Sequence, residues 1–379
     1  MDPSASPRKP PSASVAPVNS ACRRIQAIFA LTFKRTTWSC TLLARRLYGM
    51  GRVKILRAVL LAGGVVVLVF LVIRIGTGPV VSVLSRMAWW QLVLICLPYG
   101  LIMAVDTLGW RYAFADQPAP YLKMLLARTA GEALNLVTAL GSVGGEAVKV
   151  WLLRSAVSYE ASVASVIVAK TTSTIAQTLL LVVGLILAKT TVPVKGDVIS
   201  GMLALLALEA LLVGGFLVTQ LSGLMRRAGR LLSWAGLIED SSYAERLDSS
   251  LREFYRHRWH RFLLSVAFHF CGWLLGALEV AAMLFVLDIP AGVATAIVIE
   301  AVGSGVRFAT FLVPGSLGVL EGTNTGLFVA LGLGASAGLA FSLVRRARQV
   351  VWIGIGLLVL VGASLQAKTV DAAPRRAVQ

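Results

Sequence analysis

The sequence predicts an all-α fold, a polytopic membrane helical bundle with about six crossing helices and two glycine-broken re-entrant hairpins. Composition is the first reason. Of the 379 residues, 57% are hydrophobic and only 14% are charged, whereas a soluble domain has about 25% charged residues. The second reason is that the apolar residues gather in long runs, and a helix of roughly 20 such residues crosses a hydrocarbon core.

The charged residues also fit a membrane protein. The chain has 36 Lys and Arg against 18 Asp and Glu, and they lie mostly between the apolar runs. This pattern is typical of cytoplasmic loops and of contact with anionic headgroups. Nucleic acid is not expected as a partner, because it would need a basic face with base-reading groups. The cysteines lie far apart, and no metal or cofactor is expected.

The first 56 residues are expected to lie outside the bilayer. Residues 1–20 are rich in Pro and Ser and should be a disordered N-terminus, without the apolar centre of a signal peptide. Residues 21–56 mix basic and apolar residues, which favours a basic juxtamembrane segment on an anionic leaflet. An alternative is that translation starts at Met50, directly before the first apolar run.

Residues 57–366 should form the membrane transport domain, followed by a cytoplasmic tail at 367–379. The basic segments 1–57 and 221–261 are both expected in the cytoplasm, and counting the crossings then places both termini there. Single apolar runs cover 57–76, 88–114, 160–187, 198–220, 261–287 and 336–366, and glycine-interrupted pairs cover 122–157 and 291–334.

The membrane domain contains an internal repeat, with halves at about 57–190 and 198–366. GSVGGE at 141–146 aligns with GSLGVLE at 315–321, at an offset of about 174 residues. Each half crosses the membrane an odd number of times, so the second copy should be upside down. In transporters, an inverted repeat of this kind places broken helices around a site near the membrane midplane.

The glycine clusters predict breaks in the two hairpins. Irregular backbone within a membrane must be buried in protein or line a wet cavity, because unsatisfied peptide groups in lipid cost several kcal/mol each. The alternative is that the glycines only allow close helix packing. The expected hinge residues are Gly141, Gly144, Gly145, Pro314, Gly315 and Gly318.

Several ionisable residues lie within the apolar runs, where each costs roughly 2.5–3.5 kcal/mol and needs a partner or water. Arg345 and Arg348 share a helix face, and two guanidinium groups can bind a phosphate or carboxylate. The alternative is that the arginines only pair with Glu279, Glu300 or Glu321. The candidate substrate-binding residues are Arg345, Arg346, Arg348, Lys170, Lys149, Arg307, Glu146 and Glu321, and the candidate coupling carboxylates are Asp106 and Glu279.

Catalysis is not expected. The sequence has no HExxH, GxSxG or Walker motif and no CxxC pair, and its longest aqueous loop is too short for a catalytic domain. Transport would therefore be passive or driven by a gradient that acts on carboxylates. A lipid-modifying enzyme that uses Glu146 or Glu321 as acid or base is a further possibility.

Residues 138–154 and 307–348 resemble the flippase-like membrane family, which includes the transmembrane region of lysylphosphatidylglycerol synthases and hopanoid-associated membrane proteins. The matching patterns are GGExxK at 144–149, PGxxGxxEG at 314–322 and SLVRRAR at 342–348. One departure is that Ala139 and Leu140 stand where the first motif often has a proline.

The resemblance implies a lipid flippase or lipid transporter of a bacterial inner membrane. Membrane lipids would be its partners, and the residues of the matching patterns would line the path. The alternative is a non-catalytic membrane partner of a lipid-modifying enzyme. The soluble aminoacyltransferase domain of the full synthases is not expected, because the chain ends soon after the last apolar run.

Overall fold

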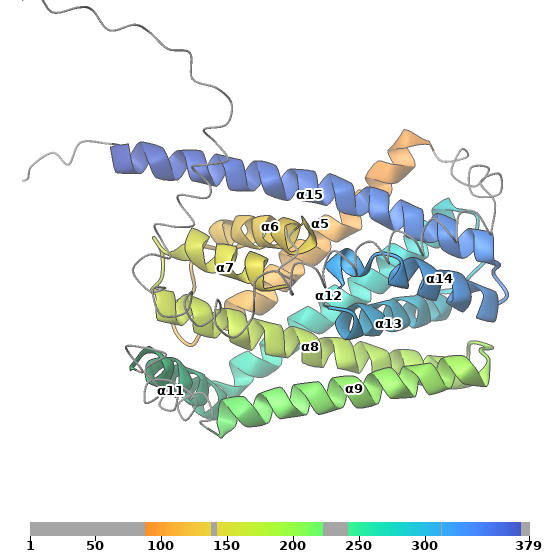
Figure 1. Ribbon diagram of the computed structural model, residues 1–379, viewed down its shortest axis with the longest axis horizontal. Helices are drawn as coiled ribbons and strands as arrows, with labels where there is room; N and C mark the ends of the chain where they lie inside the picture. Colours follow the sequence, from red (N-terminus) through yellow and green to blue (C-terminus); the bar gives the residue numbers. More distant parts are fainter. Residues whose placement is uncertain (1–87, 138–141, 223–241, 312, 373–379) are drawn as a thin grey trace, which may run out of the picture.

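The computed structural model describes residues 88–137, 142–222, 242–311 and 313–372, and all secondary structure in these ranges is helical. Four predicted features lie outside the described residues, namely the N-terminal segments 1–20 and 21–56, the apolar run 57–76, and Gly141. The helices form one layered bundle, in which long helices enclose shorter ones (Figure 1).

Within the described residues, five helices are long and apolar enough to cross a membrane. They confirm five of the six predicted crossings, and the sixth is the run at 57–76. The last helix continues through residues that were predicted to be tail. The five helices are α5 (Trp89–Tyr112), α8 (Tyr159–Thr190), α9 (Gly196–Leu221), α12 (Trp259–Val286) and α15 (Ala335–Ala372).

Two pairs of shorter helices occupy the positions of the predicted hairpins. The first pair is α6 (Tyr121–Val137) and α7 (Ser142–Leu153). The second is α13 (Val293–Ala309) and α14 (Val319–Ala330), with the short turn η1 (Pro314–Ser316) between them. Helix α6 contacts η1, so the two hairpins meet inside the bundle (Figure 1).

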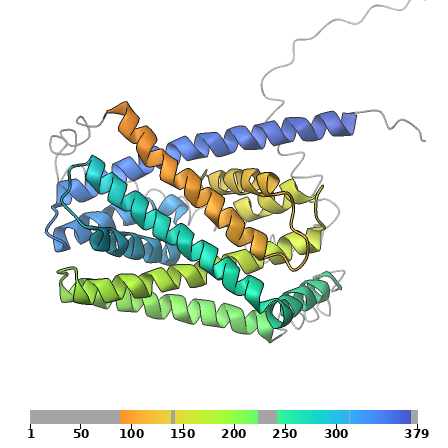
Figure 2. The same ribbon diagram turned by 180° about the vertical axis from the view of Figure 1, so that it is seen from behind.

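The arrangement of the helices is the one expected of an inverted repeat. The order of a long helix, a short pair and a long helix occurs twice, as α5 to α8 and as α12 to α15. Helices α5 and α12 pack side by side and run in opposite directions (Figure 2). Helix α6 of the first half packs on α15 of the second, and α13 of the second half packs on α8 of the first.

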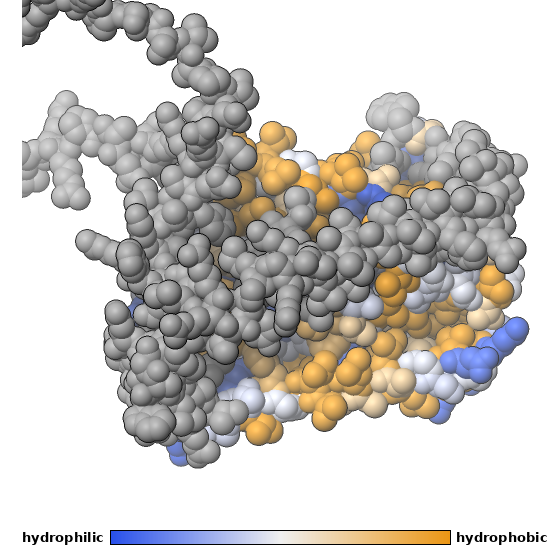
Figure 3. Space-filling view, in the orientation of Figure 1, coloured by the Kyte–Doolittle hydropathy of each residue, from blue (hydrophilic) through white to orange (hydrophobic). Residues whose placement is uncertain are grey.

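Lipid-facing and buried surfaces are clearly separated. One apolar core lies among α8, α12 and α13, and another among α5, α8 and the amphipathic helix α11 (Ser242–His257). Large side chains such as Leu211, Phe285 and Leu358 remain exposed. Apolar residues fill the middle of the uncovered face over α9, and hydrophilic residues lie at its end near the α8–α9 connection (Figure 3). A bundle surrounded by lipid is expected to have this distribution.

Candidate functional site

Glu300 on α13 joins two arginines. Its Oε1 accepts a hydrogen bond from Arg307 Nη2 at 2.6 Å, and its Oε2 accepts one from Arg345 Nη2 of α15 at 2.5 Å. The Glu300 side chain is 2% exposed, whereas that of Arg307 is 28% exposed. Buried charges of this kind are tolerated because they are paired and hydrogen-bonded. The pairing fixes the first arm of the second hairpin against the last helix.

Arg348 connects α15 to both α12 and α5. Its Nη1 lies 3.0 Å from Oε1 of Glu279 on α12, and both side chains are almost fully buried. Its guanidinium lies 4.1 Å from the ring centroid of Tyr99 on α5, which is a cation–π contact. Tyr99 in turn packs against Trp352, with ring centroids 5.2 Å apart. Arg348 therefore holds the two halves of the repeat together.

Arg346 points toward the break in the second hairpin. Its Nε donates to Oε1 of Glu321 at 2.6 Å, and its Nη1 donates to the carbonyl of Gly315 at 2.8 Å. Oε2 of Glu321 accepts from the backbone N–H of Gly318 at 2.6 Å, which caps the start of α14. Gly315 and Gly318 have φ of 58° and 78°, a conformation that favours glycine.

The structure therefore places the second predicted break at these two glycines, of which Gly315 lies in η1 and Gly318 follows it. Each arginine of the SLVRRAR segment pairs with one of the glutamates that the sequence left as alternative partners. Each of the three pairs links α15 to a different helix: Arg345 to α13, Arg346 to α14 and Arg348 to α12.

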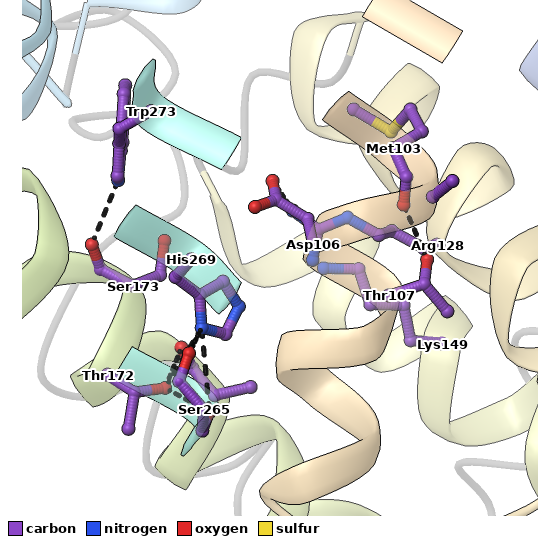
Figure 4. A network of polar contacts seen from close by, with 12 residues as sticks. Met103, Asp106, Thr107, Arg128, Lys149, Thr172, Ser173, Ser265, His269 and Trp273 are labelled. Atoms are coloured by element: carbon purple, nitrogen blue, oxygen red, sulfur yellow. Dashed lines mark hydrogen bonds and ion pairs between the residues drawn. The ribbon is translucent and has the colours of Figure 1, made fainter. Parts of the chain in front are cut away.

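A separate polar cluster lies in the first half. Asp106 on α5 accepts from Arg128 Nη2 of α6 at 2.6 Å, and Lys149 on α7 donates to both carboxylate oxygens of Glu146 at 2.9 and 3.0 Å. Asp106, Arg128 and Lys149 lie together in Figure 4. Lys170 on α8 is exposed and acts electrostatically on Glu146. The structure thus groups Lys170 with the first-half cluster.

A hydrogen-bonded group around His269 joins three helices. His269 Nδ1 lies 3.2 Å from Thr172 Oγ1 of α8 (Figure 4). Ser265 Oγ donates to the carbonyl of Gly109 on α5 at 2.8 Å. A Cβ at Gly109 would overlap the His269 ring, so the glycine allows α5 and α12 to approach closely. The geometry assigns this group a structural role.

Gly144 and Gly145, two of the predicted hinge residues, lie inside α7 and not at a break in the helix. Gly145 instead packs closely against α6. Its N–H donates to Asn135 Oδ1 at 2.8 Å, and a Cβ there would overlap the carbonyl of Gly131. Gly145 therefore serves close helix packing, as small residues often do in membranes.

An apolar groove of about 500 Å³ lies between α9, α13 and α14. Three glycines in its lining, Gly201, Gly322 and Gly326, leave open space where a side chain would project. The other lining residues are mostly aliphatic and include Leu205, Val302 and Val306.

A family model described as the lysylphosphatidylglycerol synthase TM region matches residues 55–357, which include both polar clusters and both hairpins. The chain belongs to this family. No curated protein and no solved structure matched. Membership and the five apolar helices show a multi-pass integral membrane protein that is related to lipid metabolism or transport.

Two residues of this family member were not among the sequence candidates. Arg128 is the partner of Asp106, and the need of a buried acid for a nearby cation was the signal that could have identified it. Glu209 lies in the run 198–220 and is fully buried, with hydrogen bonds from Gln177 and Thr178. An acid in so apolar a run was itself the signal.

Proposed function

We propose that the protein moves a lipid with an anionic headgroup between the leaflets of a bacterial inner membrane, as a flippase or lipid transporter and not as an enzyme. A surplus of positive charge on the arginines around Glu279 and Glu300 carries the proposal. Among the described residues, three arginines, Arg307, Arg345 and Arg348, share two glutamates, Glu279 and Glu300. An unbalanced charge is costly at membrane depth, and a bound anion would balance it.

The first-half cluster differs in this respect. Its basic and acidic residues are equal in number, with Arg128, Lys149 and Lys170 near Asp106, Glu132 and Glu146. Pairing alone can therefore neutralise the first cluster. This contrast favours the second cluster as the headgroup site.

Two guanidinium nitrogens converge on Gly303 of α13. A Cβ placed on Gly303 would lie 3.7 Å from Arg307 Nη1 and 3.8 Å from Arg345 Nη1. Arg345 Nη1 is buried and has no hydrogen-bond partner among the described residues. A phosphate or carboxylate oxygen in the space left by the missing side chain could accept hydrogen bonds from both arginines. Arg307 is partly exposed, which gives the anion a way in.

The apolar groove offers a place for the lipid chain. Val302 and Val306 line the groove, and Gly303 and Arg307 follow them by one position on α13. Successive helical positions are turned by about 100°, so the groove and the arginines lie on adjacent sides of one helix. A headgroup at Gly303 would have apolar space beside it. The left-handed glycines Gly315 and Gly318 are positions at which this hairpin could bend.

Liposomes that contain the purified protein and a fluorescent anionic phospholipid test the proposal, with a membrane-impermeant quencher reporting lipid exchange. Gly303→Leu fills the proposed site without changing any charge, and Arg307→Gln removes one donor. Both should slow exchange about 10–100-fold, the equivalent of one or two charge-assisted hydrogen bonds. Gly214→Leu is the matched control, because Gly214 lies in open space on the exposed face of α9.

Other results would contradict the proposal. Unchanged exchange by folded Gly303→Leu protein would exclude the site at Gly303. No exchange by the wild-type protein alone, together with stable co-purification of a lipid-modifying enzyme, would favour a non-catalytic partner. A new lipid species in the liposomes, detected by mass spectrometry, would indicate an enzyme.

A further inference from the structure

A buried carboxylate on α9 lies apart from the arginines. Glu209 has no solvent-exposed surface, although α9 is the most apolar of the five membrane-crossing helices. Its Oε1 accepts from Gln177 Nε2 of α8 at 2.9 Å. The same Gln177 amide donates to the carbonyl of Ser304 on α13 at 3.1 Å. Glu209 therefore belongs to a polar connection that joins α8, α9 and α13.

The groups that face Glu209 are neutral. Helix α8 contributes Gln177 and Thr178, and α13 contributes Gly305, on which a Cβ would lie 3.4 Å from Glu209 Oε1. Helix α11 also packs on α9, but its Tyr255 donates to Gln220. No charged group among the described residues acts on Glu209. An isolated carboxylate in an apolar interior is costly when ionised and tends to bind a proton instead.

The number of hydrogens available to the contacts around Glu209 favours a proton bound to its carboxylate. Thr178 has one hydroxyl hydrogen but two acceptors, the carbonyl of Thr174 and Oε2 of Glu209, each at 3.0 Å. If Glu209 is ionised, one of these contacts lacks a hydrogen. If Oε2 of Glu209 is protonated, it donates to Thr178 Oγ1, and Thr178 donates to Thr174. Gln177 still donates to Oε1, so each of these contacts then has its own hydrogen.

We propose that Glu209 is a proton-binding site, held as a carboxylic acid in this conformation, and that release of its proton loosens α13. On release, the proton passes to water and the Thr178 hydroxyl turns from Thr174 to the carboxylate. The Gln177 amide, which connects Glu209 to Ser304, is then drawn to the new charge. Ser304 directly follows Gly303, so the proton acts on the helix segment that carries the proposed headgroup site.

The proposed proton site, Glu209, is not one of the coupling carboxylates that the sequence predicts, which are Asp106 and Glu279. Both of those are paired with arginines, Arg128 and Arg348, whereas Glu209 is not. The link from proton release to lipid movement rests on the proposed function. The protonation of Glu209 does not, and it is measured separately.

Infrared spectroscopy of the full-length protein in lipid tests the proton site directly. Wild-type protein at neutral pH should show the carbonyl stretch of an un-ionised carboxylic acid, and Glu209→Gln should lack it. Asp197→Asn, the same chemical change at an exposed site on α9, should keep it. Identical spectra for the wild type and both variants would overturn the proposal. Thr178→Val, which removes the acceptor of the carboxyl hydrogen, should shift the band, so the assignment can be checked even if Glu209→Gln does not fold.

Stability measured against pH gives a second test. The folded protein keeps a proton that the unfolded chain releases above about pH 4.3, the ordinary ionisation range of Glu. Raising the pH should therefore favour unfolding of the wild type by up to about tenfold per pH unit in the equilibrium constant, relative to Glu209→Gln. If the stability of the wild type and that of Glu209→Gln depend on pH in the same way, the proposal is overturned.

Lipid exchange under an imposed pH gradient tests the coupling. The gradient should accelerate exchange by the wild type and by Asp197→Asn, but not by Glu209→Gln. An equal response of all three proteins would overturn the coupling. If the wild type moves no lipid, the proposed function fails, while the carboxylic-acid band still decides whether Glu209 holds a proton.

Discussion

Replacing Glu300 by alanine should destabilise the protein more than replacing Arg307, one of the two arginines that it binds. Glu300 is 2% exposed and binds Arg307 and Arg345 at 2.6 and 2.5 Å. Without it, two guanidinium groups lose their carboxylate at membrane depth. Removing one partner of a single buried ion pair costs about 3–5 kcal/mol. Because Glu300 serves two arginines, Glu300→Ala should lie at the upper end of this range.

Arg307→Ala is the matched comparison. Its side chain is 28% exposed, and Glu300 keeps Arg345 after the substitution. The free energy of unfolding should fall by about 1.5–3 kcal/mol, the contribution of one charge-assisted hydrogen bond. The free energy of unfolding, from denaturant titration in mixed micelles with a spectroscopic readout of helix content, measures both variants.

The double variant Glu300→Ala/Arg345→Ala completes the test. It removes opposite charges together, so its loss should be smaller than the sum of the two single losses by about 0.5–3 kcal/mol. Equal losses for Glu300→Ala and Arg307→Ala, or strict additivity in the double variant, would refute the reasoning that Glu300 neutralises both arginines.

Three further substitutions test local packing by thermal unfolding. Gly318→Ala should cost about 1–3 kcal/mol because Gly318 has a φ of 78°, whereas Gly322→Ala, in open space, should lose less; equal losses would contradict the role of the left-handed turn. Gly145→Ala should cost about 1–3 kcal/mol because its Cβ would overlap α6, and an unchanged melting temperature would argue against that close contact. Tyr99→Leu should cost about 0.5–2 kcal/mol by removing the ring beneath Arg348; a neutral result would show that the ring contributes nothing measurable.

The membrane-crossing helices could be predicted because hydrophobic length dictates them. The apolar run 160–187 became α8 at Tyr159–Thr190, and the run 261–287 became α12 at Trp259–Val286. The pairs of charged residues were harder to predict. Arg128 and Asp106 belong to different helices, and only the packing of α6 against α5 makes them partners.

The two glycine motifs show why the hinge residues could not all be predicted. Gly315 and Gly318 adopt left-handed conformations at a break, whereas Gly145 is helical and packs against Gly131. Both uses need a residue without a side chain, so the motifs look alike in sequence. The distance to the neighbouring helix decides between them, and that distance is a property of the assembled bundle.

The exchange of hairpins between the halves has a consequence for biogenesis. Helix α15 is synthesised after α12, α13 and α14, yet it supplies the arginines that pair with their acids. It also provides the surface on which α6, an early helix, packs. Neither half is self-sufficient. Glu279 and Glu321 are made before the arginines of α15 with which they pair, whereas Glu300 has Arg307 on its own helix and gains Arg345 later. Insertion of α15 should therefore lock the helices that precede it, and a chain that stalls before α15 should be recognised and degraded as unassembled.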